Sequence, residues 1–245
     1  MRDQALDLLL AAPVEHADGH RIALHRIDDL PVGLGLDVLV GHVVAVHEQE
    51  LGAQEPDADR ARLWVIDGGK ALRRAIGETF GATALVQRCQ EHKRRNVLDH
   101  LPEELHASVG RAMRDAWDST DAELAKKQLQ RLATSLQSRH PGAAASLREG
   151  LDETLTVQAL GISGALYRTL RTTNPIENLN GSIAHYTRNV KRWRDGQMTL
   201  RWVASALSDA KGRFRKLRGH RDMKQLMAAL DRRINAKQPG ALKAA

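Results

Sequence analysis

Two acidic residues occupy positions at which a fold can use a carboxylate for chemistry. Asp67 directly follows residues 63–66, a short apolar run that predicts a buried strand, and α/β folds bind ligands beyond the C-terminal ends of their strands. Glu177 lies in the first turn of a predicted helix that is capped by Asn174 and has Pro175 in its first position. Carboxylate oxygens are ligands that Mg²⁺ prefers, and two of them at one site would suit phosphoryl transfer assisted by two metal ions.

Both acids also have a structural interpretation. Asp67 could cap the helix that is predicted to begin at Lys70, because aspartate is common in turns. Glu177 could reach back to the backbone N–H of Asn174, as in a capping box. Sequence spacing does not establish that the two acids meet in space, so both interpretations stay open at this point.

A third candidate is the pair Cys89 and His92, which has C-x-x-H spacing. A zinc site takes further ligands, and no others stand near this pair in the sequence, so the indication of zinc is weak. The pattern favours Cys89 as a small buried side chain at the end of a strand. His92 would then line a cleft or satisfy a hydrogen bond in the core. Neither a G-x-x-x-x-G-K-[ST] loop nor a G-x-G-x-x-G turn is present, so no nucleotide cofactor is expected.

The distribution of charge predicts a polyanionic partner. The net charge is +7, yet residues 1–60 carry 4 Arg, no Lys and 12 acidic residues, whereas residues 181–245 carry 16 basic and 4 acidic residues. A basic C-terminal third is typical of proteins that bind nucleic acid. The alternative is a charged helix face that is simply solvated. The residues expected to contact DNA are Arg188, Lys191, Arg192, Trp193, Arg194 and Arg201.

Two tryptophans lie within this basic stretch. Trp193 stands between Arg192 and Arg194, so it could either stack on an unpaired base or anchor the core. Trp202 lies in an apolar helix beside Val203, and we expect it in the core.

The surrounding pattern predicts the elements that must position these side chains. Strands are predicted over residues 38–40, 43–46, 63–66 and 84–86, and helices over 70–80 and 90–101, from 174 onward and over 198–214. Alternation of strands and helices indicates an α/β layer. Residues 102–170 are predicted to be helical throughout, with Thr120 and Glu123 as a capping box and Leu124 in the apolar stripe of the next helix.

The composition is that of a globular protein, with 42% hydrophobic and 27% charged residues in a chain of 245. No apolar run approaches the ~18 residues of a membrane-spanning helix, and the first residues make a poor secretory signal. The single cysteine excludes an internal disulfide. We therefore expect a cytoplasmic protein with no membrane partner.

Five stretches, in this order, resemble the mutator-type transposases of bacterial insertion sequences. They are VIDGGKAL at 65–72, VQRCQEHKRRNV at 86–97, SLREGL with ETLTV at 146–157, TNPIENLN at 173–180, and RNVKRW with MTLRW at 188–202. The resemblance covers about residues 62–235, and five ordered motifs are far more specific than any one of them.

The resemblance implies an α/β fold, mainly helical overall, in which a partial ribonuclease-H-like core is interrupted by an all-helical insertion. It implies two aspartates and one glutamate that bind two divalent metal ions, Mg²⁺ or Mn²⁺. Such enzymes cut DNA at the ends of the insertion sequence and join the ends to target DNA, and a homo-oligomer is expected. Asp67 matches the second aspartate and Glu177 the glutamate, which makes both expected catalytic residues and metal ligands. His92, in the family's C-x-x-H signature, could approach the scissile phosphate.

The first aspartate of the family has no match in this chain. It should lie on the opening strand of a β-meander, and Asp37 stands too close to Asp67 for a meander and the helix after it. We therefore expect a truncated or frame-shifted transposase of low activity; the alternatives are a catalytically inactive fragment that binds DNA or dimerises, and a product that does not fold. The expected parts are an atypical acidic segment (1–60), the second half of the ribonuclease-H-like core (61–101), the helical insertion (102–170), the glutamate helix with a basic helical region (171–235) and a frayed tail (236–245).

Overall fold

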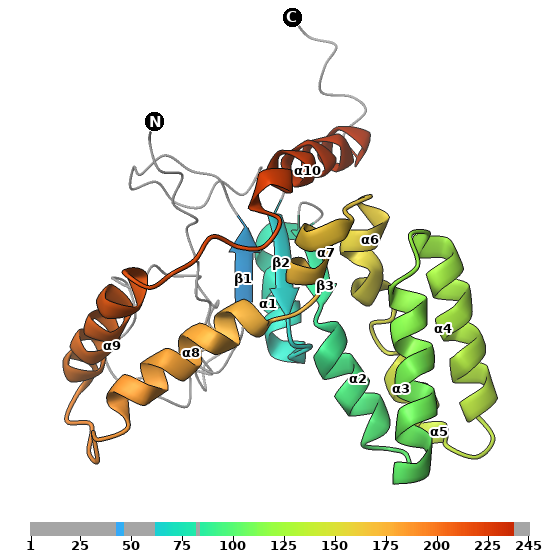
Figure 1. Cartoon of the computed structure of the whole chain (residues 1–245), viewed down its shortest axis with the longest axis horizontal. Helices are drawn as coiled ribbons and strands as arrows, with labels where there is room; N and C mark the ends of the chain where they lie inside the picture. Colours follow the sequence, from blue (N-terminus) through green and yellow to red (C-terminus); the bar gives the residue numbers. More distant parts are fainter. Residues whose placement is uncertain (1–42, 47–61, 82–83, 238–245) are drawn as a thin grey trace, which may run out of the picture.

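A small sheet lies at the centre of the molecule, with helices on its sides (Figure 1). The computed structural model describes residues 43–46, 62–81 and 84–237. Its three strands are β1 (Val43–Val46), β2 (Arg62–Ile66) and β3 (Ala84–Arg88), in the order β1-β2-β3. β1 pairs antiparallel with β2, and β2 pairs parallel with β3, so that Ile66 stands opposite Arg88. The predicted strand over 43–46 is confirmed, and the one over 38–40 lies outside the described residues.

The middle strand is buried on both faces. Leu63 and Val65 point into one cluster, which also holds residues of the later helices, while Trp64 and Ile66 point into another. This second cluster contains the inner face of α1 (Lys70–Phe80), the helix that joins the parallel strands β2 and β3. α1 has the predicted boundaries and ends at Gly81, whose φ is +51°.

The next helices form a bundle with its own core. They are α2 (Gln90–Leu98), α3 (Glu103–Trp117), α4 (Ala122–Leu136) and α5 (Pro141–Arg148), and they share one cluster of buried apolar side chains. The short helices η4 (Asp152–Leu155) and α6 (Thr156–Ala159) then bring the chain back to the sheet. The hydroxyl of Thr156 donates to the carbonyl of Val86 over 2.6 Å, so this return segment covers the open side of β3.

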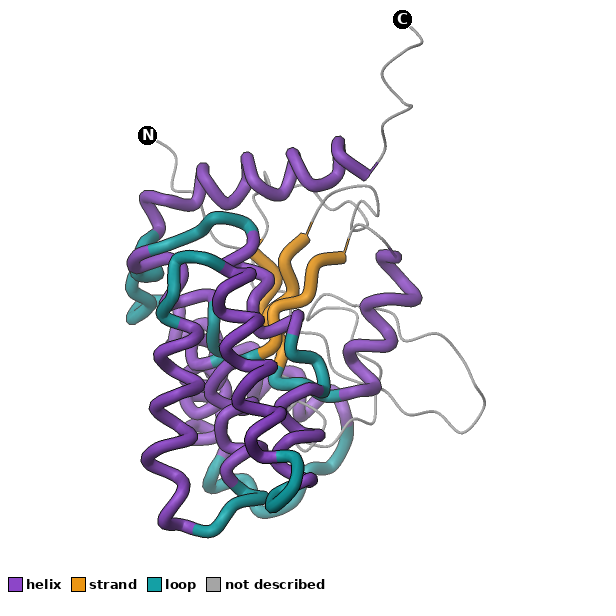
Figure 2. Tube along the Cα trace, turned by 90° about the vertical axis from the view of Figure 1, so that its right-hand side faces the viewer, coloured by secondary structure: helices purple, strands orange, loops and turns teal. Residues whose placement is uncertain are grey.

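The C-terminal helices leave the sheet and come back to it. They are α7 (Gly164–Leu170), α8 (Asn174–Thr187), α9 (Gly196–Lys211), η5 (His220–Asp222) and α10 (Met223–Lys237). α8 and α9 pack against each other as an arm that reaches away from the sheet (Figure 1). α10 lies across the end of the sheet opposite to the start of α8 (Figure 2). No helix within the described ranges is long and apolar enough to cross a membrane.

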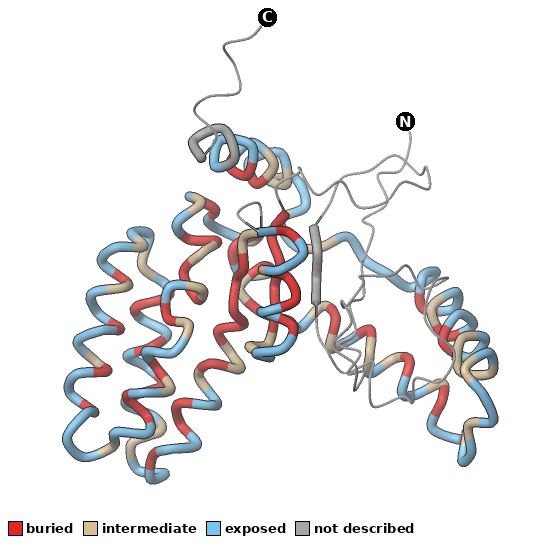
Figure 3. Tube along the Cα trace, turned by 180° about the vertical axis from the view of Figure 1, so that it is seen from behind, coloured by how far each residue is buried: buried red, intermediate tan, exposed pale blue. Residues whose placement is uncertain are grey.

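Two apolar side chains that were expected inside lie at the surface. Trp202 is 41% exposed and Leu124 is 46% exposed. α9 buries a narrow stripe of Val203, Ala206 and Ala210, which does not include Trp202. Figure 3 shows that most of the described chain outside the sheet alternates in this way between buried and exposed positions. α4 likewise buries the stripe that begins at the neighbour of Leu124, Ala125. The expectation of core positions was therefore wrong for both residues.

Several helix ends differ from the prediction by a few residues. α2 ends at Leu98, before the predicted end at residue 101, and α9 covers residues 196–211 rather than 198–214. The cap of α4 is Asp121, whose carboxylate accepts from the backbone N–H groups of Glu123 and Leu124, so the capping box at Thr120 was wrong. α8 begins at Asn174 with Thr173 as its cap, one residue earlier than expected.

The connection from α9 to α10 is fastened to α7 at a glycine that cannot be replaced without strain. Gly219 has a φ of +81°, and a Cβ there would lie 2.2 Å from the backbone nitrogen of Leu166. We expect Gly219→Ala to lower the free energy of unfolding by about 2 kcal/mol or more, since a left-handed conformation costs about 1–2 kcal/mol without Gly and the backbone overlap adds to it. The measurement is urea unfolding followed by circular dichroism.

Gly181→Ala is the matched control for this prediction. Gly181 lies inside α8, and a Cβ there would have no atom within 4 Å. We expect this change to stabilise the protein by about 0.5–1 kcal/mol, because alanine favours a helix over glycine. Equal unfolding midpoints for the two variants would contradict the close contact at Gly219.

Candidate active site

Asp67 lies in the turn that joins the C-terminal end of β2 to α1. Its Oδ1 accepts a hydrogen bond of 2.9 Å from the backbone N–H of Gly69, so Asp67 is a turn residue. The cap of α1 is Gly69, without a side-chain bond, so the interpretation of Asp67 as the cap of this helix was wrong. The residue between them, Gly68, has a φ of +114° and lies against the guanidinium of Arg88. A carboxylate oxygen that accepts such a bond can also be a ligand of a metal ion.

Glu177 lies in the first turn of α8 and is held by its neighbours. Its Oε1 accepts from the hydroxyl of Thr173 over 2.5 Å and lies 3.7 Å from Nδ1 of His92. The same hydroxyl lies 3.3 Å from Nδ1 of His92. The three side chains therefore form one connected group, in which the capping residue of α8 orients both the acid and the histidine.

Cys89 joins the segments that carry the two acids. Its backbone N–H donates to the carbonyl of Ile66 over 2.7 Å, directly before Asp67. Its sulfur accepts from the backbone N–H of Thr173 over 3.4 Å, directly before α8. Cys89 is fully buried directly after β3, so the prediction of a small buried side chain at the end of a strand is confirmed. The end of β2, the start of α2 and the start of α8 are thus brought together at this residue.

Three helices within the described residues begin at this end of the sheet. α1 begins at Lys70, shortly after Asp67. α2 begins at Gln90, directly after Cys89, and α8 begins at Asn174, directly after Thr173 (Figure 1). The N-terminus of a helix carries a partial positive charge and unpaired backbone N–H groups. An anionic group such as a phosphate would be stabilised beside these three starts.

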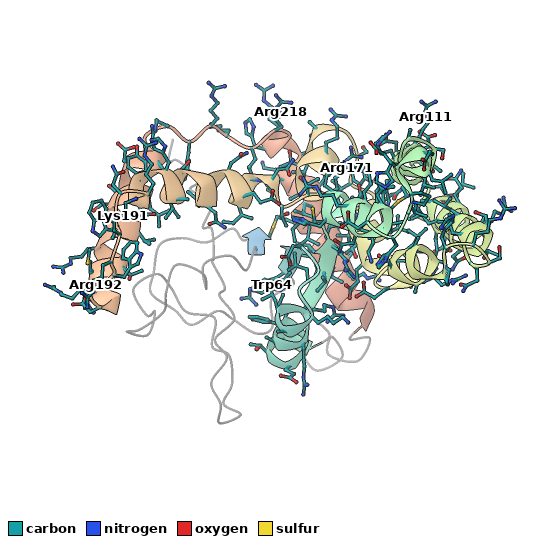
Figure 4. The ribbon with its side chains drawn as sticks, turned by 90° about the horizontal axis from the view of Figure 1, so that it is seen from below. Trp64, Arg111, Arg171, Lys191, Arg192 and Arg218 are labelled. Atoms are coloured by element: carbon teal, nitrogen blue, oxygen red, sulfur yellow. The ribbon has the colours of Figure 1, made fainter. Side chains whose placement is uncertain are left out.

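The basic residues predicted to contact DNA lie at the far end of the arm. Arg188 follows α8, and Lys191 and Arg192 are exposed in the loop between α8 and α9. Figure 4 shows Lys191 and Arg192 well apart from Trp64 of the sheet. Glu177 and Arg188 are 11 positions apart along α8 and its cap, which corresponds to about 16 Å of helix.

The remaining members of this group differ in their surroundings. Arg194 pairs with Asp195 over 2.9 Å, and Arg201 on α9 is exposed and donates to the carbonyl of Gln197. Trp193 is half-buried, so it is neither fully exposed for stacking on a base nor fully buried as an anchor of the core. The structure therefore groups these residues on the arm and not with the two acids.

Sequence reasoning missed several residues that shape this site. Thr173 is fully buried and joins Glu177 to His92, and the one signal for it was a hydroxyl just before a helix start. Arg88 and Lys93 are buried cations that meet Glu149 of the bundle. Because more than 50 residues separate these partners along the chain, no local pattern could have paired them.

Comparison with known proteins identifies the family to which these segments belong. The family described as "Transposase, Mutator family" matches residues 57–216. The transposase of insertion sequence IST2 from Acidithiobacillus ferrooxidans is 29% identical over 129 residues, which are 53% of this chain and 43% of that protein. The transposase of ISRM5 from Rhizobium meliloti is 32% identical over 141 residues, or 58% and 35%.

A third relative is also the transposase of an insertion sequence. The transposase of IS256 in transposon Tn4001 from Staphylococcus aureus is 28% identical over 149 residues, which are 60% of this chain and 37% of that protein. The matches thus span about two fifths of the length of these curated relatives. Because the family match runs from before β2 to beyond the arm, and so contains every segment that meets at Cys89, the chain belongs to the mutator family of transposases.

Proposed function

We propose that this chain carries a site for cutting and joining DNA at the ends of an insertion sequence, in which Asp67 and Glu177 are metal ligands. The observation that carries the proposal is the linkage through Cys89, which ties the residue before Asp67 to the residue that holds Glu177. In this proposal β2, α1, β3 and α2 belong to a ribonuclease-H-like core, and the helices within residues 102–170 belong to the insertion.

The donor chemistry of the two acids fits Mg²⁺ or Mn²⁺. Magnesium in proteins is commonly bound by one or two carboxylates, with waters and substrate phosphate oxygens as its other ligands. Asp67 and Glu177 are both half-buried, so neither is sealed from solvent. When bound, such ions supply an activated attacking oxygen and stabilise the charge on the leaving oxygen. The three helix starts beside them would favour the approach of a phosphodiester.

His92 and Thr173 act in this proposal as positioning residues for Glu177. The hydroxyl of Thr173 donates to the carboxylate, and the imidazole lies close enough to change its hydrogen bonding. With Nδ1 turned toward this pair, the ring is oriented by the protein before DNA arrives. His92 is half-buried, which is compatible with an approach to the scissile phosphate.

DNA is the proposed partner of the arm. Lys191 and Arg192 are exposed and have no carboxylate partner among the ion pairs of the described residues. Cations of this kind bind the DNA backbone without regard to sequence. Duplex DNA that contacts the arm would extend along α8 toward Glu177, and a second copy of the chain would bring the other end of the element.

A second candidate function is a catalytically inactive fragment that binds DNA or dimerises. The observation that favours it is that the described residues contain no group of three or more His, Cys, Asp or Glu side chains that could hold a metal ion. With two carboxylates rather than three, metal binding and the stabilisation of developing charge would be weaker. DNA binding by the arm would not depend on the acids.

The test uses the purified full chain with DNA that carries the ends of the insertion sequence. The proposed function predicts Mn²⁺ binding that weakens by about tenfold or more in Asp67→Asn and in Glu177→Gln, and DNA nicking that requires Mg²⁺ or Mn²⁺ and is lost in Glu177→Gln. Glu78→Gln, an exposed acid on α1 that pairs with Arg74, is the control. DNA binding without nicking, unchanged in both acid variants, would leave the second candidate instead.

A further inference from the structure

Three charged side chains meet where the bundle joins the sheet. They are Arg88 at the end of β3, Lys93 in α2 and Glu149 just after α5, whose side chain is 46% exposed, and we refer to the three as the charge cluster. The side chains of Lys93 and Arg88 are only 1% and 7% exposed. Lys93 Nζ donates to the carbonyl of Ser146 over 2.6 Å, to Glu149 Oε2 over 3.0 Å and to the carbonyl of Glu149.

Arg88 lies between the bundle and the turn of Asp67. Its Nη1 donates to Glu149 Oε2 over 2.5 Å, which fixes one end of the guanidinium. A Cβ on Gly68 would lie 2.5 Å from Arg88 Nε, and a Cβ on Gly150 would lie 2.6 Å from Nη1. The guanidinium is thus packed against Gly68 on one side and Gly150 on the other, with contact distances that only glycine allows.

The guanidinium is held mainly by Glu149. Nε of Arg88 is buried and has no hydrogen-bond partner within the described structure, so this atom does not hold the guanidinium in place. Nη1 also donates to the carbonyl of Glu149 over 3.3 Å. Within the described residues, the hydrogen bonds of this guanidinium therefore go to one residue of the bundle, and the contact with Gly68 is one of packing alone.

We propose that the charge cluster positions Asp67: Glu149 of the bundle holds Arg88 against Gly68, and Arg88 thereby sets the backbone of the turn that carries Asp67. The functional meaning of this link rests on the proposed role of Asp67, whereas the link itself does not. Arg88 is a positioning residue, because it acts through the turn and not on DNA.

Burial and hydrogen bonding shift the pKa values of two members of the cluster. Burial lowers the pKa of the Lys93 ammonium, and the hydrogen bond to Glu149 opposes this effect. Burial alone would raise the pKa of the Glu149 carboxyl, but the hydrogen bonds from Lys93 and Arg88 outweigh it and hold the pKa below its usual value.

A second contact joins α1, which follows the turn of Asp67, to the segment that follows α5. Nε of Arg73 in α1 donates to Glu153 Oε1 over 2.5 Å, and this pair lies near the surface. Glu153 Oε2 would also lie 3.5 Å from a Cβ on Gly150. The residues directly after α5 thus face both the turn of Asp67 and the first turn of α1, as a positioning device at this junction requires.

The test follows amide hydrogen exchange by nuclear magnetic resonance in the full chain. The reporters are Gly69, whose N–H bonds to Asp67, and Arg73, whose N–H bonds to the carbonyl of Gly69. Leu129 of α4 reports on the bundle. We expect Glu149→Gln to speed exchange at Gly69 and Arg73 by at least about tenfold, with a much smaller change at Leu129.

Arg88→Lys is the second variant, because it keeps the charge next to Glu149 and removes the planar group that packs on Gly68. We expect it to speed exchange in the turn while leaving Leu129 as in the unaltered protein. Glu104→Gln, an exposed acid of α3, is the control and should change none of the three amides. Unchanged exchange at Gly69 and Arg73 in both variants would overturn the proposal, as would an equal increase at Leu129.

Mn²⁺ affinity separates this proposal from the proposed function. If the unaltered chain binds Mn²⁺ and Glu149→Gln binds it about tenfold more weakly, the positioning of Asp67 is supported as a functional device. If the unaltered chain binds no Mn²⁺, the proposed role of Asp67 fails, but the exchange measurement still decides whether Arg88 holds the turn.

Discussion

Trp117→Ala is expected to lower the free energy of unfolding by about 3–5 kcal/mol, the range for removing a large buried aromatic side chain. Trp117 is 2% exposed and ends α3, where the bundle meets the return segment. Its Nε1 donates to the hydroxyl of Thr154 over 3.1 Å, and its carbonyl accepts from the hydroxyl of Tyr167 over 2.6 Å. The substitution would leave a cavity that α3 cannot close while its end is held by Tyr167.

Two further variants make this prediction specific. Trp117→Phe keeps most of the apolar volume and loses the bond to Thr154, so we expect a loss of about 1–2 kcal/mol. Trp202→Ala removes the same side chain from an exposed position of α9, and we expect a loss of less than about 1 kcal/mol. The measurement is urea unfolding followed by circular dichroism. Equal losses for Trp117→Ala and Trp202→Ala would show that burial does not distinguish the two positions.

The contrast between these tryptophans shows what a sequence pattern can predict. The strand over 63–66 and the helix over 70–80 were predicted correctly, because an apolar run between polar residues and a glycine stop are local signals. Which apolar residues of α9 face inward depends on the helix that packs on it. The narrow buried stripe of α9 leaves Trp202 outside, and nothing within α9 itself encodes the position of α8.

In the candidate site, too, local signals were predictable and contacts between distant segments were not. Asp67 and Glu177 could be singled out from the strand end and the helix start that carry them. Their connection depends on Cys89, whose backbone and sulfur contact segments on either side of it in the fold. Arg88 and Glu149 are 61 residues apart along the chain, and their pairing follows from the return of the chain after the bundle. The sequence could therefore single out the two candidate acids, but it could not predict the contacts that join them.

The basic loop of the arm gives the second prediction of large effect. The double variant Lys191→Gln/Arg192→Gln is expected to weaken binding to duplex DNA by about 10- to 100-fold at physiological salt, since neither side chain could then neutralise a phosphate. Both residues are exposed at the tip of the arm (Figure 4). The slope of the logarithm of affinity against the logarithm of salt concentration should also fall by about two, one for each cation removed. Fluorescence anisotropy at several salt concentrations measures both quantities.

The double variant Arg111→Gln/Arg131→Gln is the matched control, because it removes the same charge from exposed positions of α3 and α4. Figure 4 shows Arg111 on the opposite side of the molecule from Lys191 and Arg192. Long-range attraction depends on total charge and falls off over about 8–10 Å in salt, whereas direct binding to a phosphate depends on position. We therefore expect the control to change the affinity by less than about threefold, with the salt slope unchanged. Equal effects of the two double variants would mean that the net charge of the chain, and not the arm, attracts DNA.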